Sequence, residues 1–194
     1  MLEFDEENHI YHVDGKVYPS VTQIIKPLYS FDGIDSGVLE YAAARGRAVH
    51  KAVELWNAND LDESTLDPVL VPYLEAYKKF ATEMKFTATH SERHLAHPSM
   101  HYAGTPDIEG RINEGKHKGE WLVDLKAVAV LHASVGVQLA AYAALIGKPS
   151  IRRAAVQLNP TGKYVFEEYN SRSDWPTFVS CLTVHNFRTN NNLK

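Results

Sequence analysis

The sequence contains a single cysteine, Cys181, among its 194 residues. One thiol cannot close an intrachain disulfide, and it cannot supply the four thiolates that an iron–sulfur cluster usually needs. We therefore expect a protein of a reducing compartment that carries no cluster of this kind.

The chain also lacks a long apolar run and an excess of positive charge. No stretch approaches the roughly 18 apolar residues of a membrane helix, and the N-terminus MLEFDEENH is acidic without an apolar centre. We therefore expect a cytoplasmic protein with no membrane partner. The 20 basic and 24 acidic residues give a net charge of -4, so nucleic-acid binding would require a local basic groove.

What remains has the composition of an ordinary globular protein. Hydrophobic residues make up 44% and charged residues 23%, which excludes disordered and collagen-like chains. The length suffices for one sizeable core, and no linker or internal repeat interrupts it. We expect one domain over residues 1–194.

Strand and helix patterns alternate along the chain. The dipeptide Asp14-Gly15 suits a tight turn and predicts a β-hairpin over residues 9–18. Further strands are expected at 86–95, 102–112, 120–128, 152–158 and 164–169. Helices are expected at 20–27, 38–57, 67–85 and 132–146, and from Ser173 onward. The first three of these further strands read as an antiparallel meander.

The densest chemical signal lies in residues 104–107 and 124–126. Residues two apart in a strand share a face, so Asp124 and Lys126 would present a carboxylate beside an ammonium. Acidic side chains from neighbouring strands, here Asp107 and Asp124, can hold Mg²⁺ or Mn²⁺, while a lysine orients or deprotonates the attacking water in phosphodiester hydrolysis. The ordinary alternative is a solvated salt bridge. The apolar run WLVDLKAVAVL favours a site, because a buried strand should not carry two charges without a partner or a metal.

The helix EYAAARGRAVHKAVELW has a polar face that carries His50, away from the apolar face. A lone histidine there is more often an ordinary surface residue than a metal ligand. Arg45, Arg47 and Lys51 flank it and could bind phosphate or be solvated charges. Gly46 costs helix propensity, which indicates close packing against a neighbouring backbone or a ligand.

Polar residues in two other helices have both structural and functional interpretations. Gln138 and Tyr142 lie one turn apart on an apolar helix, which by itself favours a buried tyrosine with an amide partner. Ser20 with Gln23 resembles a capping box, and the hydroxyls of Ser20 and Thr22 also suit a DNA phosphate.

Four histidines fall in the segment SERHLAHPSMH. They show no tight metal-ligand spacing, so we expect mostly exposed strand and loop positions, where they could titrate near a substrate. The four are His90, His94, His97 and His101.

Four motifs occur in a fixed order: GRAVH (46–50), GTPD (104–107), VDLK (123–126) and QLAAY (138–142). This series resembles that of RecB-like nucleases in the PD-(D/E)XK superfamily. The opening YHVDGKVYPSVTQII also resembles phage exonucleases and the mitochondrial genome maintenance exonuclease group. Each motif alone is common, but the ordered set with sensible spacing is specific, and it spans most of residues 9–142.

The resemblance implies a fold and a function. The fold would be α/β (α+β) with a restriction-endonuclease-like core: a mixed central sheet flanked by helices, an N-terminal β-hairpin, and segment 20–85 as one wall of a DNA groove. The function would be that of an exonuclease acting on DNA ends without sequence preference, with Mg²⁺ or Mn²⁺ as cofactor, in phage or bacterial recombination or repair. A structure-specific endonuclease and a non-catalytic DNA-binding module remain alternatives.

The resemblance further implies partners and residue roles. A phage single-strand annealing protein is an implied partner, in the cytoplasm of a bacterium or a phage-infected host. The implied metal ligands are His50, Asp107, Asp124 and the carbonyl of Leu125. Lys126 would position or activate the attacking water, and Glu92 is a second candidate for catalysis. Gln138 and Tyr142 would support the site and touch the DNA strand.

Overall fold

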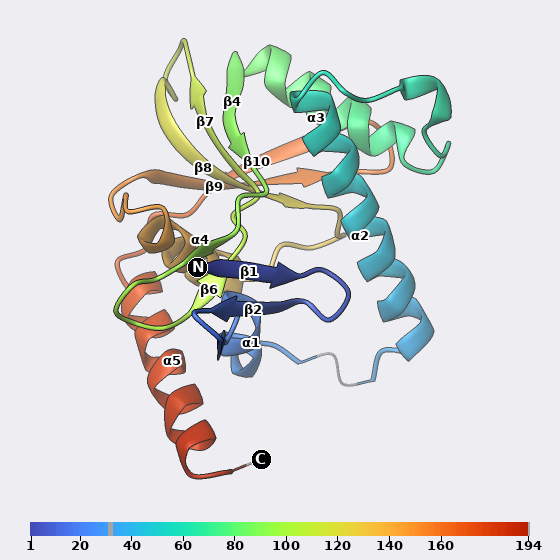
Figure 1. The fold of residues 1–194 in the computed structure, drawn as a ribbon. Helices are drawn as coiled ribbons and strands as arrows, with labels where there is room; N and C mark the ends of the chain where they lie inside the picture. Colours follow the sequence, from blue (N-terminus) through green and yellow to red (C-terminus); the bar gives the residue numbers. More distant parts are fainter. Residues whose placement is uncertain (31–32, 194) are drawn as a thin grey trace.

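A mixed β-sheet forms the centre of the structure, a computed structural model that describes residues 1–30 and 33–193 (Figure 1). The five strands lie in the order β10-β9-β8-β7-β4. They are β4 (Phe86–Ser91), β7 (Ile108–Ile112), β8 (Gly119–Lys126), β9 (Arg152–Leu158) and β10 (Tyr164–Glu168). Strands β4, β7 and β8 form the predicted antiparallel meander, β8 and β9 run parallel, and β10 pairs antiparallel with β9. The expected mixed sheet is therefore confirmed. Of the expected domain, residues 31, 32 and 194 lie outside the described part, and residues 31 and 32 belong to its 20–85 segment.

Three antiparallel strands at the N-terminus form a separate small sheet beside the central one (Figure 1). They are β1 (Leu2–Asp5), β2 (Ile10–Val13) and β3 (Lys16–Tyr18). The predicted turn is confirmed, since Asp14 and Gly15 both have positive φ, as a tight hairpin turn requires. Strand β1 was not predicted. It places Phe4 directly opposite Tyr11.

Helices cover both faces of the central sheet. On one face, α2 (Ser36–Asn57) and α3 (Val71–Glu83) pack with the sheet through buried residues such as Val53, Phe80 and Val123. On the other, α1 (Val21–Ile24), α4 (Ser134–Leu145) and α5 (Asp174–Asn190) pack through residues such as Leu139 and Phe178. Helix α4 is the crossover that the parallel pair β8 and β9 requires. Within the described ranges, no helix combines the length and apolar content of a membrane span.

The alternation along β8 decides which way its charged residues face. Trp121, Val123 and Leu125 belong to the core beneath α2 and α3, whereas Leu122 belongs to the core beneath α4. Because strand residues alternate between faces, Asp124 and Lys126 share the α4 face with Leu122. In agreement, Lys126 contacts Gln138 of α4.

The strand expected over residues 102–112 is instead two strands. A short β6 (Ala103–Gly104) pairs with β5 (Leu95–Ala96), and β7 begins only at Ile108. Pro106 lies in the break, where its missing N–H prevents a continuous ladder. The break leaves Asp107 just outside β7.

Two glycines differ in the space around them, which gives a test of this packing. A Cβ on Gly110 in β7 would lie 2.3 Å from Phe86 Cζ and 2.6 Å from the Thr87 backbone oxygen. We expect Gly110→Ala to lower the free energy of unfolding by about 1–3 kcal/mol through overpacking. A Cβ on Gly46 would meet no atom within 4 Å, so the expected close packing of Gly46 against a neighbouring backbone is wrong. The control Gly46→Ala should therefore be neutral or stabilising by up to about 1 kcal/mol. Urea unfolding followed by circular dichroism measures both, and a Gly110→Ala variant as stable as the wild type would contradict the packing.

Candidate metal centre

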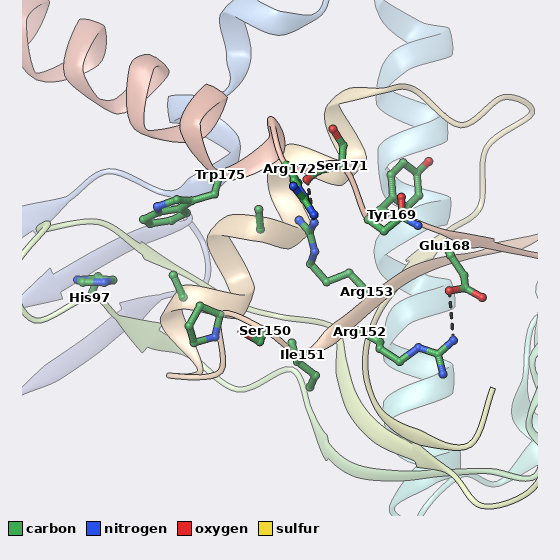
Figure 2. A pocket seen from close by; sticks show the side chains of 14 residues that line it. His97, Ser150, Ile151, Arg152, Arg153, Glu168, Tyr169, Ser171, Arg172 and Trp175 are labelled. Atoms are coloured by element: carbon green, nitrogen blue, oxygen red, sulfur yellow. Dashed lines mark hydrogen bonds and ion pairs between the residues drawn. The ribbon is translucent and has the colours of Figure 1, made fainter. Parts of the chain in front are cut away.

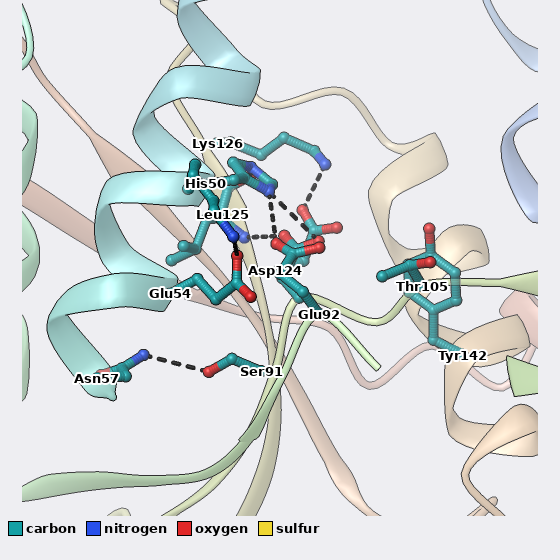
Figure 3. Close-up of polar contacts among 12 residues, drawn as sticks. His50, Glu54, Asn57, Ser91, Glu92, Thr105, Asp124, Leu125, Lys126 and Tyr142 are labelled. Atoms are coloured by element: carbon teal, nitrogen blue, oxygen red, sulfur yellow. Dashed lines mark hydrogen bonds and ion pairs between the residues drawn. The ribbon is translucent and has the colours of Figure 1, made fainter. Parts of the chain in front are cut away.

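Three segments meet beside the end of β8 (Figure 3). Residues Ser91 and Ile108 pair across β4 and β7, so Glu92 and Asp107, one residue beyond them, are neighbours. The Glu92 N–H donates to the Asp107 carbonyl at 2.9 Å. His50 of α2 completes the group, and one ligand atom from each of these three side chains lies within 4.8 Å of the others. The group could hold a metal ion.

Three oxygen atoms lie close to the two ring nitrogens of His50. Its Nδ1 is 3.2 Å from Glu92 Oε1 and 3.6 Å from Asp107 Oδ1, and its Nε2 is 3.0 Å from the Leu125 carbonyl oxygen. Burial alone would lower the pKa of His50, but the Asp107 charge and the hydrogen bond to Glu92 outweigh it and raise the pKa to about 9. His50 is therefore an imidazolium at neutral pH, with both ring nitrogens donating.

The two carboxylate oxygens of Asp107 have different partners. Its Oδ2 accepts a hydrogen bond of 2.6 Å from the Leu125 N–H, which leaves Oδ1 directed toward His50. Burial raises the pKa of Asp107, and the His50 charge counteracts this. The carboxylate is only 7% exposed, so its orientation is set by these contacts.

Asp124 and Lys126 form a buried ion pair next to this group (Figure 3). Lys126 Nζ lies 2.5 Å from Asp124 Oδ2 and donates to Gln138 Oε1 at 3.3 Å, and Gln138 Nε2 donates to the Tyr142 hydroxyl at 3.2 Å. Burial alone would lower the pKa of Lys126, but the charges of Asp124 and Asp107 raise it. Lys126 is therefore a cation at neutral pH. Burial raises the pKa of Asp124 to about 6, although the Lys126 charge opposes it.

One oxygen of Asp124 lacks any hydrogen-bond partner within the described chain. Asp124 is 1% exposed, Oδ1 accepts no hydrogen bond, and Oδ2 meets Lys126 only as an ion pair. A buried carboxylate oxygen without a partner is costly unless a ligand satisfies it. A cation is the ligand that fits such an oxygen, so the donor set suits a metal ion.

The site opens into a cleft of about 490 Å³ between α2 and the N-terminal sheet. Arg47, Lys51 and Thr22, three of the predicted DNA-binding residues, line it, and so does Tyr142. Lys51 is already paired with Glu54 at 2.8 Å.

Two other predicted DNA-binding residues are engaged elsewhere. Ser20 is 2% exposed, and its hydroxyl accepts from the Gln23 N–H at 3.1 Å while Gln23 Oε1 accepts from the Ser20 N–H at 2.9 Å. The predicted capping box is thus confirmed, and this hydroxyl does not face the cleft. Arg45 donates to the Ala127 carbonyl at 3.1 Å and lies over the Tyr73 ring, so it joins α2 to the loop after β8. Gln138 accepts a hydrogen bond from Lys126 and is not among the residues that line the cleft.

The opposite wall of the cleft contains three residues that the sequence patterns did not identify as functional, together with His94, one of the histidines expected to be exposed near a substrate. We call Phe4, His9, Tyr11 and His94 the aromatic wall; all four line the cleft. Thr105 links this wall to the metal centre, since its Oγ1 is 2.7 Å from both the Tyr11 hydroxyl and His94 Nδ1. Recognising β1 as a strand, from the alternation in LEFD, would have placed Phe4 beside Tyr11.

A second cleft, of about 770 Å³, lies among α4, β9, β10 and the start of α5 (Figure 2). Its arginines are largely satisfied by the protein: Arg152 pairs with Glu168 at 3.3 Å and Arg153 with Asp174 at 3.1 Å. No motif residue that suggests catalysis lines it.

Comparisons with protein-family models and with curated proteins give no match. Among solved structures the chain is similar to the crystal structure of SSO0001, at 16% sequence identity, over 73% of this chain and 69% of that chain. The TM-score is 0.36, so this likeness carries no argument about fold or function. The interpretation of the site therefore rests on its own geometry.

We expect calorimetric titration with Mn²⁺ to show binding that Asp107→Asn abolishes. The asparagine keeps an oxygen for the Leu125 N–H, while the charge next to His50 is removed. Asp60→Asn, an exposed residue outside the cleft, is the matched control. Undiminished binding by Asp107→Asn would exclude the site as described.

The His50 pKa of about 9 predicts that metal binding depends on pH. Below that pH the ring holds a proton that a metal must displace, so Mn²⁺ affinity should fall by about tenfold per pH unit between pH 8.5 and 6.5. Calorimetry in buffers of different ionisation enthalpy should detect about one proton released. An affinity that is constant over this range would show that His50 is not a ligand.

Proposed function

We propose that this protein is a divalent-metal-dependent nuclease that hydrolyses phosphodiester bonds at DNA ends, on a restriction-endonuclease-like core. The observation that carries the proposal is the meeting of His50, Glu92 and Asp107 beside the buried pair Asp124 and Lys126. All of these residues except Glu92 come from the motifs that resemble RecB-like nucleases, and they lie in separate segments of the chain. The mixed sheet flanked by helices agrees with such a core without being specific to it.

The donor set suits Mg²⁺ or Mn²⁺, because carboxylate and carbonyl oxygens are the ligands that these hard ions prefer. The side chains that would hold the metal are His50, Glu92, Asp107 and Asp124, together with the Leu125 carbonyl. A bound metal would neutralise the scissile phosphate and stabilise the leaving oxygen as a Lewis acid.

Lys126 would position the attacking water. Its ammonium is held between Asp124 Oδ2 and Gln138 Oε1, and its raised pKa keeps it protonated. A protonated lysine donates hydrogen bonds and does not accept a proton, so this geometry favours orientation over deprotonation of the water. Gln138 and Tyr142 hold the ammonium in place from α4.

The charge of the cleft supports a dependence of DNA binding on metal. Four carboxylates line the cleft, and two of them, Glu92 and Asp107, lie at the metal centre. Phosphates would be repelled unless a divalent ion and the cations of α2, Arg47 and Lys51, balanced these charges. Segment 20–85, which contributes Arg47 and Lys51 through α2, would thus form one wall of a DNA groove.

Digestion of end-labelled linear DNA and closed circular DNA with Mg²⁺ tests the proposal. We expect the linear DNA to shorten progressively and the closed circles to survive. Efficient linearisation of closed circles would instead favour a structure-specific endonuclease. Lack of Mg²⁺-dependent cleavage, with DNA binding retained, would favour a non-catalytic module.

Lys126→Ala is the matched variant for this assay. It should bind Mn²⁺ but cleave about 10²- to 10³-fold more slowly, since removing one preorganised hydrogen-bond donor from an active site typically costs that much. Lys79→Ala, a half-exposed lysine of α3, is the control and should cleave at the wild-type rate. A Lys126→Ala variant of full activity would contradict the mechanism even if the protein is a nuclease.

A further inference from the structure

The aromatic wall is a preorganised surface of rings that pack in tilted and edge-on pairs. The Phe4 ring lies 4.2 Å from the His94 ring and 4.6 Å from the Tyr11 ring, measured between centroids, and His9 meets Phe4 edge-on at 5.1 Å. Tyr11 is 1% exposed, and its hydroxyl shares Thr105 Oγ1 with His94. The rings are therefore fixed by packing and by two hydrogen bonds before any ligand arrives.

This wall stands directly beside the metal centre. Thr105, to which it is bonded, precedes Asp107 by two residues. The wall, His50 and Asp107 line the same cleft, whose volume of about 490 Å³ lies within the range of about 300–1,000 Å³ typical of small-ligand sites. A group attached to a phosphate at the metal centre would thus reach the rings.

The two histidines of the aromatic wall are accessible to a ligand and do not belong to the buried core. Phe4 and Tyr11 bury the inner side of the wall, whereas His9 and His94 are exposed. His9 ends the turn between β1 and β2, where its φ of +54° is a conformation that turns use. Covering the core would not require either imidazole.

The charges around the cleft indicate which part of a nucleotide would meet the rings. Arg47 and Lys51 line the α2 side, and carboxylates at Glu6 and Glu54 lie among them. Phosphates would be directed toward the cations and the metal centre. The uncharged base would face the rings, where stacking on an aromatic surface is sequence-tolerant.

We propose that Phe4, His9 and His94 form a stacking platform for the base of the terminal, unpaired nucleotide of the DNA strand being cut. A base inside a duplex is covered by its neighbours and cannot lie against these rings, so the occupant is a single-stranded or frayed end. The inference rests on the proposed function, because it assumes that the strand's phosphate lies at the metal centre.

Fluorescence anisotropy on labelled single-stranded oligonucleotides in Ca²⁺ tests the platform by binding alone, with the DNA checked to be intact. Each oligonucleotide carries either a normal or an abasic terminal nucleotide, at the 5′ or the 3′ end. We expect the wild type to bind one normal end about 5- to 100-fold more tightly than its abasic counterpart. If normal and abasic oligonucleotides bind equally well, whichever end carries the abasic nucleotide, the proposal is overturned without any variant.

Variants then assign the preference to the rings. The double variant His9→Ala with His94→Ala keeps only the Phe4 ring of the platform and should lose most of the preference, and His9→Phe should retain the preference because the ring is kept. The control His185→Ala, on α5 outside the cleft, should behave as the wild type. An undiminished preference in the double alanine variant would refute the platform.

The outcome is separable from that of the nuclease assay. A base preference in a protein that cleaves no DNA would refute the nuclease and support the platform. Cleavage of linear DNA by a protein with no base preference would refute the platform and support the nuclease.

Discussion

The hydrogen bond from the Leu125 N–H to Asp107 Oδ2 is the contact on which the site depends. It crosses from β8 to the residue just before β7 and turns the other Asp107 oxygen toward His50. His50 in turn bonds the Leu125 carbonyl, so the backbone of one residue of β8 orients both an acidic and a basic side chain. The aromatic wall is tied to the same short segment through Thr105.

The charges near this contact are buried together and would be unfavourable separately. Asp107 and Asp124 are almost fully buried, and His50 and Lys126 balance them as cations. Replacing one such group leaves its partner charged in a poorly solvated place, which is strongly destabilising in general. An arrangement of this kind in a cleft, with an unsatisfied oxygen on Asp124, is typical of a site built for a ligand and not for stability alone.

Local patterns in the sequence were sufficient to predict most elements and to place Asp124 and Lys126 on the same face of their strand. Alternation and helical periodicity are local properties, so the hairpin, the capping box, the meander and the long helices followed from them. Contacts between distant segments could not be predicted from these local patterns. Single-sequence patterns do not show how distant elements pack. Three contacts depend on that packing: the pairing of β1 with β2, the hydrogen bond of Arg45 to Ala127, and the contact of His50 with Glu92. Pro106 divides the strand expected over residues 102–112, because its missing N–H interrupts a ladder that alternation alone would continue.

The claim that the metal lies between His50, Glu92 and Asp107 can be tested most directly by crystallography. Anomalous scattering from crystals soaked in Mn²⁺ would locate the ion without reference to activity. The account predicts an anomalous peak in contact with Asp107 and at least one further member of the group, with His50 Nδ1 or Nε2 released from its present acceptor. A well-occupied Mn²⁺ peak elsewhere, with none at Asp107, would contradict it.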